Sequence, residues 1–125
     1  MVTRSPAAER SWRLIVLAAG ITHALIGLTF LVAGRNLVGP VFDNADGIPA
    51  VVWGLWALAS GVAICWRRTR FAGLCATAAW YALWGTVLAL GIIQAGGPFY
   101  AVPVYIFLIL LHAAFAVTDW LERHQ

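Results

Sequence analysis

The sequence predicts an all-α fold, a bundle of four transmembrane helices that forms a single domain over residues 1–125. Three observations predict it: a composition that is 62% hydrophobic and 10% charged, four long apolar stretches without charges, and breaks rich in glycine and proline between them. A soluble core of this size cannot bury so much apolar surface. We therefore expect lipid around most of these side chains.

The four apolar stretches are the expected membrane spans. Each is close to the ~20 residues that an α-helix needs to cross ~30 Å of hydrocarbon. Backbone polar groups in lipid have to be paired within the segment, and helices achieve this. The second connection is so short that the two middle helices are expected to form an antiparallel hairpin. The spans cover residues 14–34, 48–66, 71–93 and 99–118.

The arginines give the orientation of these spans. Positive charge accumulates on the cytoplasmic side of membrane proteins, and only Arg35 lies in a connection on the other side. The prediction is a multi-pass protein of the bacterial cytoplasmic (inner) membrane with both termini in the cytoplasm. The arginines on the predicted cytoplasmic side are Arg4, Arg10, Arg13, Arg67, Arg68, Arg70 and Arg123.

Several classes of function find no support in the residues. A nucleic-acid partner would need a larger basic cluster on a soluble face. The sequence contains no phosphate-binding loop, nucleophile elbow or metalloprotease helix, so we expect neither enzymatic activity nor a metal site. Asp119 and Glu122, beside Arg123, are expected to be solvated charges at the membrane interface.

Small residues recur on one face of the first span. Gly20, Gly27 and Gly34 share a face with His23, and the second span repeats the device with Gly54 and Gly61. Such residues let helices approach closely in lipid, where packing drives association. The contacts are expected either within one bundle or between protomers.

Two tryptophans, Trp80 and Trp84, lie one turn apart in the middle of the third span. Tryptophan usually gathers at the membrane interface. We expect these two rings to pack inside the bundle, with a ligand cleft or a lipid-headgroup cleft as the alternative.

His23 and His112 are the two histidines within the predicted spans. Polar groups at that depth are costly and usually face protein or water. They would meet at similar depth if the first and last helices are neighbours. Three interpretations stay open: neutral histidines that form hydrogen bonds across helices, a proton- or ion-linked site, and ligation of haem b by both rings. The hydrogen-bond partners considered are Thr22, Thr29, Thr77 and Thr86.

The layout resembles small four-span membrane proteins encoded by phages of high-GC bacteria, which are called holin-like. The segments that carry the resemblance are Gly20-Ile21-Thr22-His23 with Gly27 and Gly34, Trp53-Gly54, and Gly96-Gly97-Pro98. The resemblance implies a non-enzymatic protein that self-associates and permeabilises the bilayer. It implies no catalytic residue.

The leading hypothesis from the sequence is therefore a holin-like, self-associating protein whose partners are the lipid bilayer and its own copies, with no bound cofactor. One alternative is an accessory subunit of a membrane complex, which binds haem b through His23 and His112. A phage exclusion factor that acts through a membrane-protein partner is the other.

Overall fold

The computed structural model describes residues 5–33, 49–96 and 101–124 of the chain. Within these residues the fold is all-helical, as predicted. The helices are α1 (Pro6–Ala33), α2 (Ala50–Cys65), α3 (Arg70–Ala95) and α4 (Ala101–Arg123). By length and composition, α1, α3 and α4 can each cross a membrane, whereas α2 is a shorter apolar helix of 16 residues. Three helices of this length and composition suggest a membrane protein.

Helix α1 begins eight residues before its apolar stretch. Pro6 occupies the first helical position, where its missing N–H leaves no hydrogen bond unmade. The Ser5 hydroxyl accepts a hydrogen bond from the backbone N–H of Ala8 at 3.2 Å. The polar start of the helix is therefore fixed by capping, which the hydropathy of the sequence does not reveal.

The turn between α2 and α3 is held by side chains of its own residues. The Thr69 hydroxyl donates to the carbonyl of Ala63 at 2.9 Å, and Arg70 Nε donates to the carbonyl of Ile64 at 3.2 Å. These bonds satisfy carbonyls at the end of α2 that have no partner within the helix. The C-terminal end of α3 is capped by Gly96. Its φ of 65° is in the left-handed region, which glycine adopts most easily.

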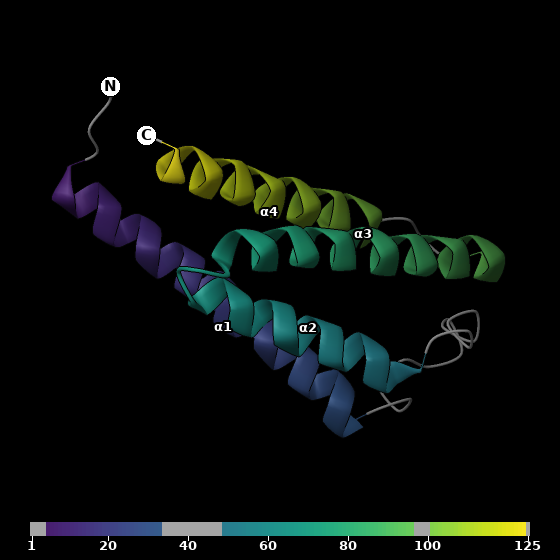
Figure 1. The fold of residues 1–125 in the computed structure, drawn as a ribbon. Coiled ribbons are helices and arrows are strands. Elements are labelled where there is room, and N and C mark those ends of the chain that lie inside the picture. The colour runs from purple at the N-terminus through teal and green to yellow at the C-terminus, as the bar shows by residue number, and fades with distance from the viewer. Residues whose placement is uncertain (1–4, 34–48, 97–100, 125) are drawn as a thin grey trace.

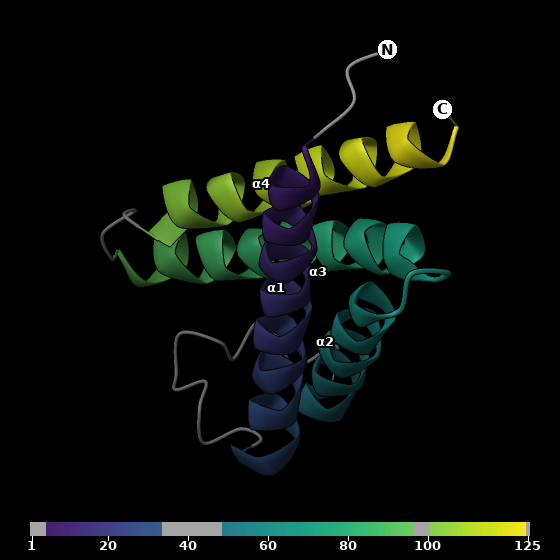
Figure 2. The same cartoon turned by 90° about the vertical axis from the view of Figure 1, so that its left-hand side faces the viewer.

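The helices form two antiparallel hairpins, α1 with α2 and α3 with α4, and α2 packs on α3 between them. Figure 2 shows α3 and α4 crossing α1 steeply, whereas in Figure 1 the same helices run at a shallow angle to one another. The sequence led us to expect an up-down bundle of neighbouring helices. The start of α1, the turn of residues 66–69 and the end of α4 nevertheless gather at one end of the molecule (Figure 1).

Glycines bring the backbones of α1 and α2 together. A Cβ atom added at Gly27 would lie 2.3 Å from the backbone nitrogen of Leu58, and one at Gly61 would lie 2.4 Å from that of Ala24. Cβ atoms at Gly20 and Gly54 would also meet the opposite helix, at distances of 2.9 Å to Cys65 Sγ and 2.8 Å to Leu31 Cγ. These four glycines therefore pack within one chain. Gly34, the last of the predicted series, lies outside the described residues.

Aromatic rings fill the space where the hairpins cross. Trp80 and Trp84 are buried, and they pack with Trp53 and Tyr81 around Ala57. The Trp80 indole N–H donates to the carbonyl of Trp53 at 3.0 Å, which links α3 to α2. The two central tryptophans thus pack inside the protein.

Candidate functional site

The structure brings His23 and His112 together at the crossing of α1 with the second hairpin. Their ring centroids lie 6.4 Å apart. His23 is 0% exposed and His112 is 3% exposed, so both imidazoles are buried inside the protein. Two polar rings at this depth require partners or an occupant, because an unpaired buried polar atom costs about 1–3 kcal/mol.

Tyr81 is the hydrogen-bond partner of His23, with 3.3 Å between the hydroxyl oxygen and Nδ1. Its ring centroid lies 5.1 Å from that of His23 and 5.2 Å from that of His112. Sequence reasoning missed Tyr81 and considered threonines instead. An available signal was that Tyr81 follows Trp80 at the middle of the third apolar stretch, where a hydroxyl needs a partner.

The threonines considered as partners have other roles. Thr29 donates to the carbonyl of Leu25, and Thr86 donates to that of Ala82, each within its own helix. Thr22 is exposed. Thr77 is fully buried, and its hydroxyl has no hydrogen-bond partner among the described residues.

The tautomer of His112 follows from its backbone contact. Its Nδ1 lies 2.8 Å from the carbonyl oxygen of Leu108, one turn earlier in α4. A carbonyl only accepts, so Nδ1 carries the proton and donates it. In the neutral ring, Nε2 is then the nitrogen with the free lone pair. A histidine oriented in this manner presents a basic nitrogen to whatever lies beside it.

Several buried polar atoms have no hydrogen-bond partner within the described residues. They include Nε2 of His23, Nε2 of His112, the Thr77 hydroxyl and the Trp53 indole nitrogen. Buried polar groups are almost always paired, with protein or with ordered water. Ordered water is the usual partner of such atoms where the protein supplies none.

Buried apolar clusters lie on either side of the two histidines. Toward the end that carries the arginines, Val16, Ile64, Leu74 and Ala116 form a buried cluster. Toward the other end lies the aromatic cluster that includes Trp80 and Trp84. We call the first cluster the aliphatic layer.

A haem does not fit between the two histidines in this arrangement. The three ring-centroid distances place the Tyr81 centroid about 4 Å from the midpoint of the histidine pair, almost in the plane perpendicular to it. A haem held by both imidazoles would occupy that plane and extend well beyond 4 Å from the midpoint, through the Tyr81 ring.

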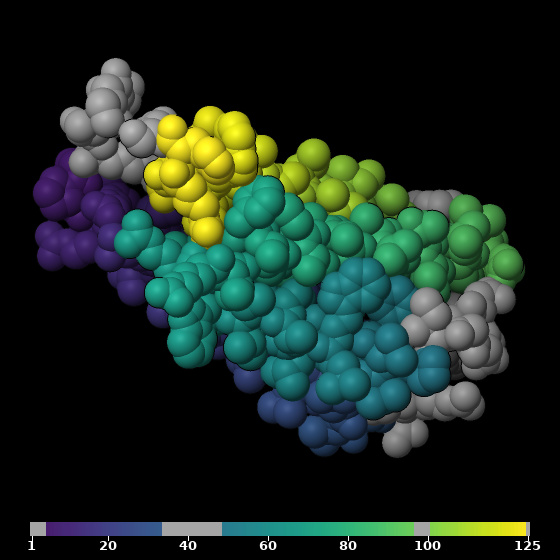
Figure 3. All heavy atoms as spheres, viewed as in Figure 1, coloured from purple at the N-terminus to yellow at the C-terminus, as the bar shows by residue number. Residues whose placement is uncertain are grey.

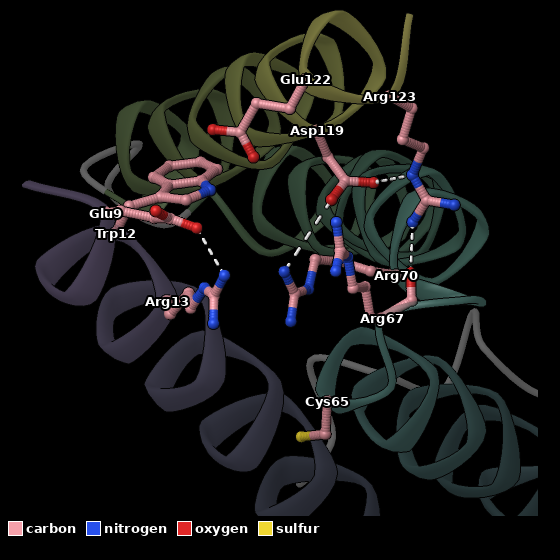
Figure 4. A pocket seen from close by; sticks show the side chains of 9 residues that line it. All are labelled: Glu9, Trp12, Arg13, Cys65, Arg67, Arg70, Asp119, Glu122 and Arg123. Atoms are coloured by element: carbon pink, nitrogen blue, oxygen red, sulfur yellow. Dashed lines mark hydrogen bonds and ion pairs between the residues drawn. The ribbon is translucent and has the colours of Figure 1, made fainter. Parts of the chain in front are cut away.

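A cavity lined by charged side chains lies at the end of the molecule where the arginines gather. A cavity of about 220 Å³, the arginine pocket, is lined by Arg13, Arg67, Arg70 and Arg123 together with Asp119 and other side chains (Figure 4). The space-filling view shows the end of α4 and the start of α3 beside the start of α1 at this end (Figure 3).

Asp119 corrects an expectation from the sequence, because its carboxylate is buried rather than solvated. The residue is 3% exposed. Arg123 Nε donates to Oδ2 at 2.8 Å, and Arg70 Nη1 lies 3.9 Å from Oδ1. Arg123 also donates to the carbonyls of Arg67 and Arg68. Asp119 pairs with Arg123 within α4, and the guanidinium of Arg123 in turn joins the end of α4 to the turn before α3.

Among the described residues, no three histidine, cysteine, aspartate or glutamate side chains form a group that could hold a metal ion. Comparison with known proteins gives no match to a protein-family model, to a curated protein or to a solved structure. The geometry of the chain itself is therefore the basis for a functional proposal.

Proposed function

We propose that this chain is a multi-pass protein of the bacterial cytoplasmic membrane, with both termini in the cytoplasm, that carries protons through a site formed by His23, Tyr81 and His112. The observation that carries the proposal is the pair of buried Nε2 atoms without partners beside a tyrosine hydroxyl. Ionisable groups inside membrane helices commonly form proton relays.

The hydrogen bonds provide a donor and an acceptor for such a relay. His112 presents a lone pair at Nε2, because its Nδ1 proton is held by Leu108. If Tyr81 donates to Nδ1 of His23, Nε2 of His23 carries the proton. A water molecule between the two rings then accepts from one nitrogen and donates to the other. Protonation of His112 turns its Nε2 from an acceptor into a donor.

Further titratable groups lie on either side of this pair along α4. Tyr105 and Asp119 are each seven residues, or about 10.5 Å, from His112 on the same face of the helix. The Tyr105 ring lies 6.3 Å from that of Tyr81. Asp119 reaches the arginine pocket. Water has to cross the aliphatic layer to connect His112 with Asp119, so this layer would limit the rate.

Proton flux into liposomes tests the proposal. Purified protein is reconstituted with a pH-sensitive dye inside, and a potassium gradient with valinomycin drives protons inward. We expect flux above that of protein-free liposomes, a return to background in His112→Phe, and no change in Thr86→Val. The control removes an exposed hydroxyl that bonds only its own helix. Flux equal to empty liposomes, or equal flux in His112→Phe, would overturn the proposal.

A second variant, Leu74→Ser, is expected to increase the proton flux. Leu74 is fully buried in the aliphatic layer. Replacing it with the smaller, polar serine should let water enter and raise the flux, since hydrophobic constrictions obstruct conduction by excluding water. Circular dichroism of each variant verifies that the helices form. An unchanged or lower flux in folded Leu74→Ser contradicts the role of this layer.

Holin-like self-association is the second candidate function, and one observation favours it. Helix α4 presents a row of large exposed apolar side chains: Val104, Phe107, Leu110 and Val117. The four described glycines do not serve this purpose, because they pack within the chain. Induced expression in bacteria, followed with a membrane-potential dye, should then cause abrupt depolarisation. Phe107→Ala with Leu110→Ala should weaken it, whereas His112→Phe should not.

A further inference from the structure

The arginine pocket lies where three separate parts of the chain meet. Arg13 comes from α1, Arg67 from the turn before α3, Arg70 from the first residue of α3, and Arg123 from the end of α4. Figure 4 shows Arg13 and Arg70 on opposite sides of the space, with Asp119 on α4. The volume of about 220 Å³ is below the ~300–1,000 Å³ of sites for drug-sized ligands. It suits a small polar group.

The charges that line the pocket are unequally matched. Glu9 forms an ion pair with Arg13, and both oxygens of Asp119 face Arg123 and Arg70. The contact of Arg70 with Asp119, at 3.9 Å, is longer than a hydrogen bond, so this guanidinium keeps donors for another acceptor. Among the described residues, the guanidinium of Arg67 has no ion pair. Four arginines and three carboxylates, those of Glu9, Asp119 and Glu122, line the pocket, so its side chains carry one positive charge in excess.

The start of α3 adds a second attraction for anions. The backbone N–H groups in the first turn of a helix have no partner within it, and they carry a partial positive charge. Thr69 precedes this turn, but its hydroxyl donates to the carbonyl of Ala63 and forms no cap. Arg70 is both the first residue of α3 and part of the pocket lining.

The pocket also lies at the boundary between charged and apolar residues. Arg13 directly precedes Leu14, and Arg70 directly precedes Phe71; the side chains of both apolar residues are exposed. Exposed Leu121 follows Asp119 by two positions on α4. In a bilayer, this boundary is the depth of lipid headgroups, with acyl chains beside the exposed apolar residues.

We propose that the arginine pocket binds a phosphate group, and that its source is the headgroup of an anionic phospholipid. Basic pockets between membrane helices at the cytoplasmic side bind such headgroups through charge and hydrogen bonds. The guanidinium of Arg67, which forms no ion pair with a described residue, and the remaining donors of Arg70 contact the phosphate oxygens. The exposed apolar side chains beside the pocket contact the acyl chains.

Native mass spectrometry of the delipidated full-length protein in detergent tests this site. The probes are phosphatidylglycerol and phosphatidylcholine with the same acyl chains, added at equal concentration. We expect phosphatidylglycerol to bind more tightly, and Arg67→Gln to weaken it about fivefold, the effect of one arginine near an anionic lipid surface. Arg68→Gln is the matched control, because Arg68 belongs to the same turn but does not line the pocket.

A second measurement distinguishes the source of the phosphate. Inorganic phosphate is added to the delipidated protein while thermal unfolding is followed. One outcome is that phosphate stabilises the protein and Arg68→Gln but not Arg67→Gln, while phosphatidylglycerol binds no better than phosphatidylcholine. This outcome supports the site with free phosphate as its ligand. Equal losses in the two variants, or no preference for phosphatidylglycerol and no effect of phosphate, would overturn the proposal. None of these outcomes depends on proton flux.

Discussion

The two hairpins are built by different means. Between α1 and α2, glycines allow direct backbone contact. A Cβ atom at Gly27 would clash with the backbone nitrogen of Leu58. In α3 with α4, side chains stand between the helices: a Cβ at Gly85 would meet the Tyr105 side chain at 3.0 Å, not a backbone atom. A backbone contact cannot adjust, whereas a side chain can. The first hairpin should therefore tolerate much less change than the second.

The largest effect is expected where backbones touch. Gly27→Ala places a methyl group 2.3 Å from Leu58 N and 2.7 Å from the carbonyl oxygen of Gly54, so the two helices have to separate. We expect a loss of about 3 kcal/mol in the free energy of unfolding, the upper end for overpacked cores. Circular dichroism during unfolding by sodium dodecyl sulfate in mixed micelles measures it. Stability equal to that of the unmodified protein would show that the first hairpin is not held in this way.

The next effect concerns the link between α4 and the turn before α3. Asp119→Asn removes the charge that pairs with Arg123 at 2.8 Å. Because the carboxylate is buried, we expect a loss of roughly 1.5–3 kcal/mol, as for hydrogen bonds to charged groups. Glu9→Gln is the control, since that ion pair is exposed and contributes about 0–1 kcal/mol. The same unfolding assay compares both, and equal losses would contradict the buried role of Asp119.

A smaller effect is expected at the contact between the hairpins. Trp80→Phe keeps a large ring in the aromatic cluster but removes the N–H that donates to the Trp53 carbonyl at 3.0 Å. We expect a loss of about 1 kcal/mol, as for one neutral hydrogen bond. Trp66→Phe serves as the control, because Trp66 is exposed. A loss no greater than in the control would mean that this bond does not join the hairpins.

The smallest effect should come from Gly85→Ala in the second hairpin. The added methyl group meets the Tyr105 side chain, which has to move by a few tenths of an ångström. Alanine also favours the helix over glycine by about 1 kcal/mol. The two terms should nearly cancel, which leaves stability within ~0.5 kcal/mol of the original. Set beside Gly27→Ala, this variant tests the comparison directly, and similar losses at the two glycines would refute it.

The same contrast explains what the sequence could reveal. Glycines at regular spacing and long uncharged stretches are local patterns, so the four helices and the close approach at Gly20 and Gly27 could be anticipated. The start of α1 and the end of α4 could not be anticipated. Capping at Ser5 and the pairing of Asp119 with Arg123 extend these helices beyond their apolar stretches.

The candidate site was only half visible in the sequence. His23 and His112 stand out because ionisable residues are rare in such helices. The depth of Tyr81 indicates only that its hydroxyl needs a partner, and which partner it finds depends on how the hairpins cross. The arginine pocket was hidden for the same reason. Its parts lie far apart in the chain and meet only in the folded protein.

The steep crossing of the hairpins has a consequence for the fit to a bilayer. At 1.5 Å per residue, the 16 residues of α2 measure about 24 Å and the 26 residues of α3 about 39 Å. A helix as long as α3 matches ~30 Å of hydrocarbon when it tilts by about 40°, whereas α2 is too short even when upright. Tilt of the second hairpin thus accommodates the longer α3, whereas α2 requires a thinner hydrocarbon layer. We expect a preference for thin bilayers, with thicker ones reducing the tilt of α3.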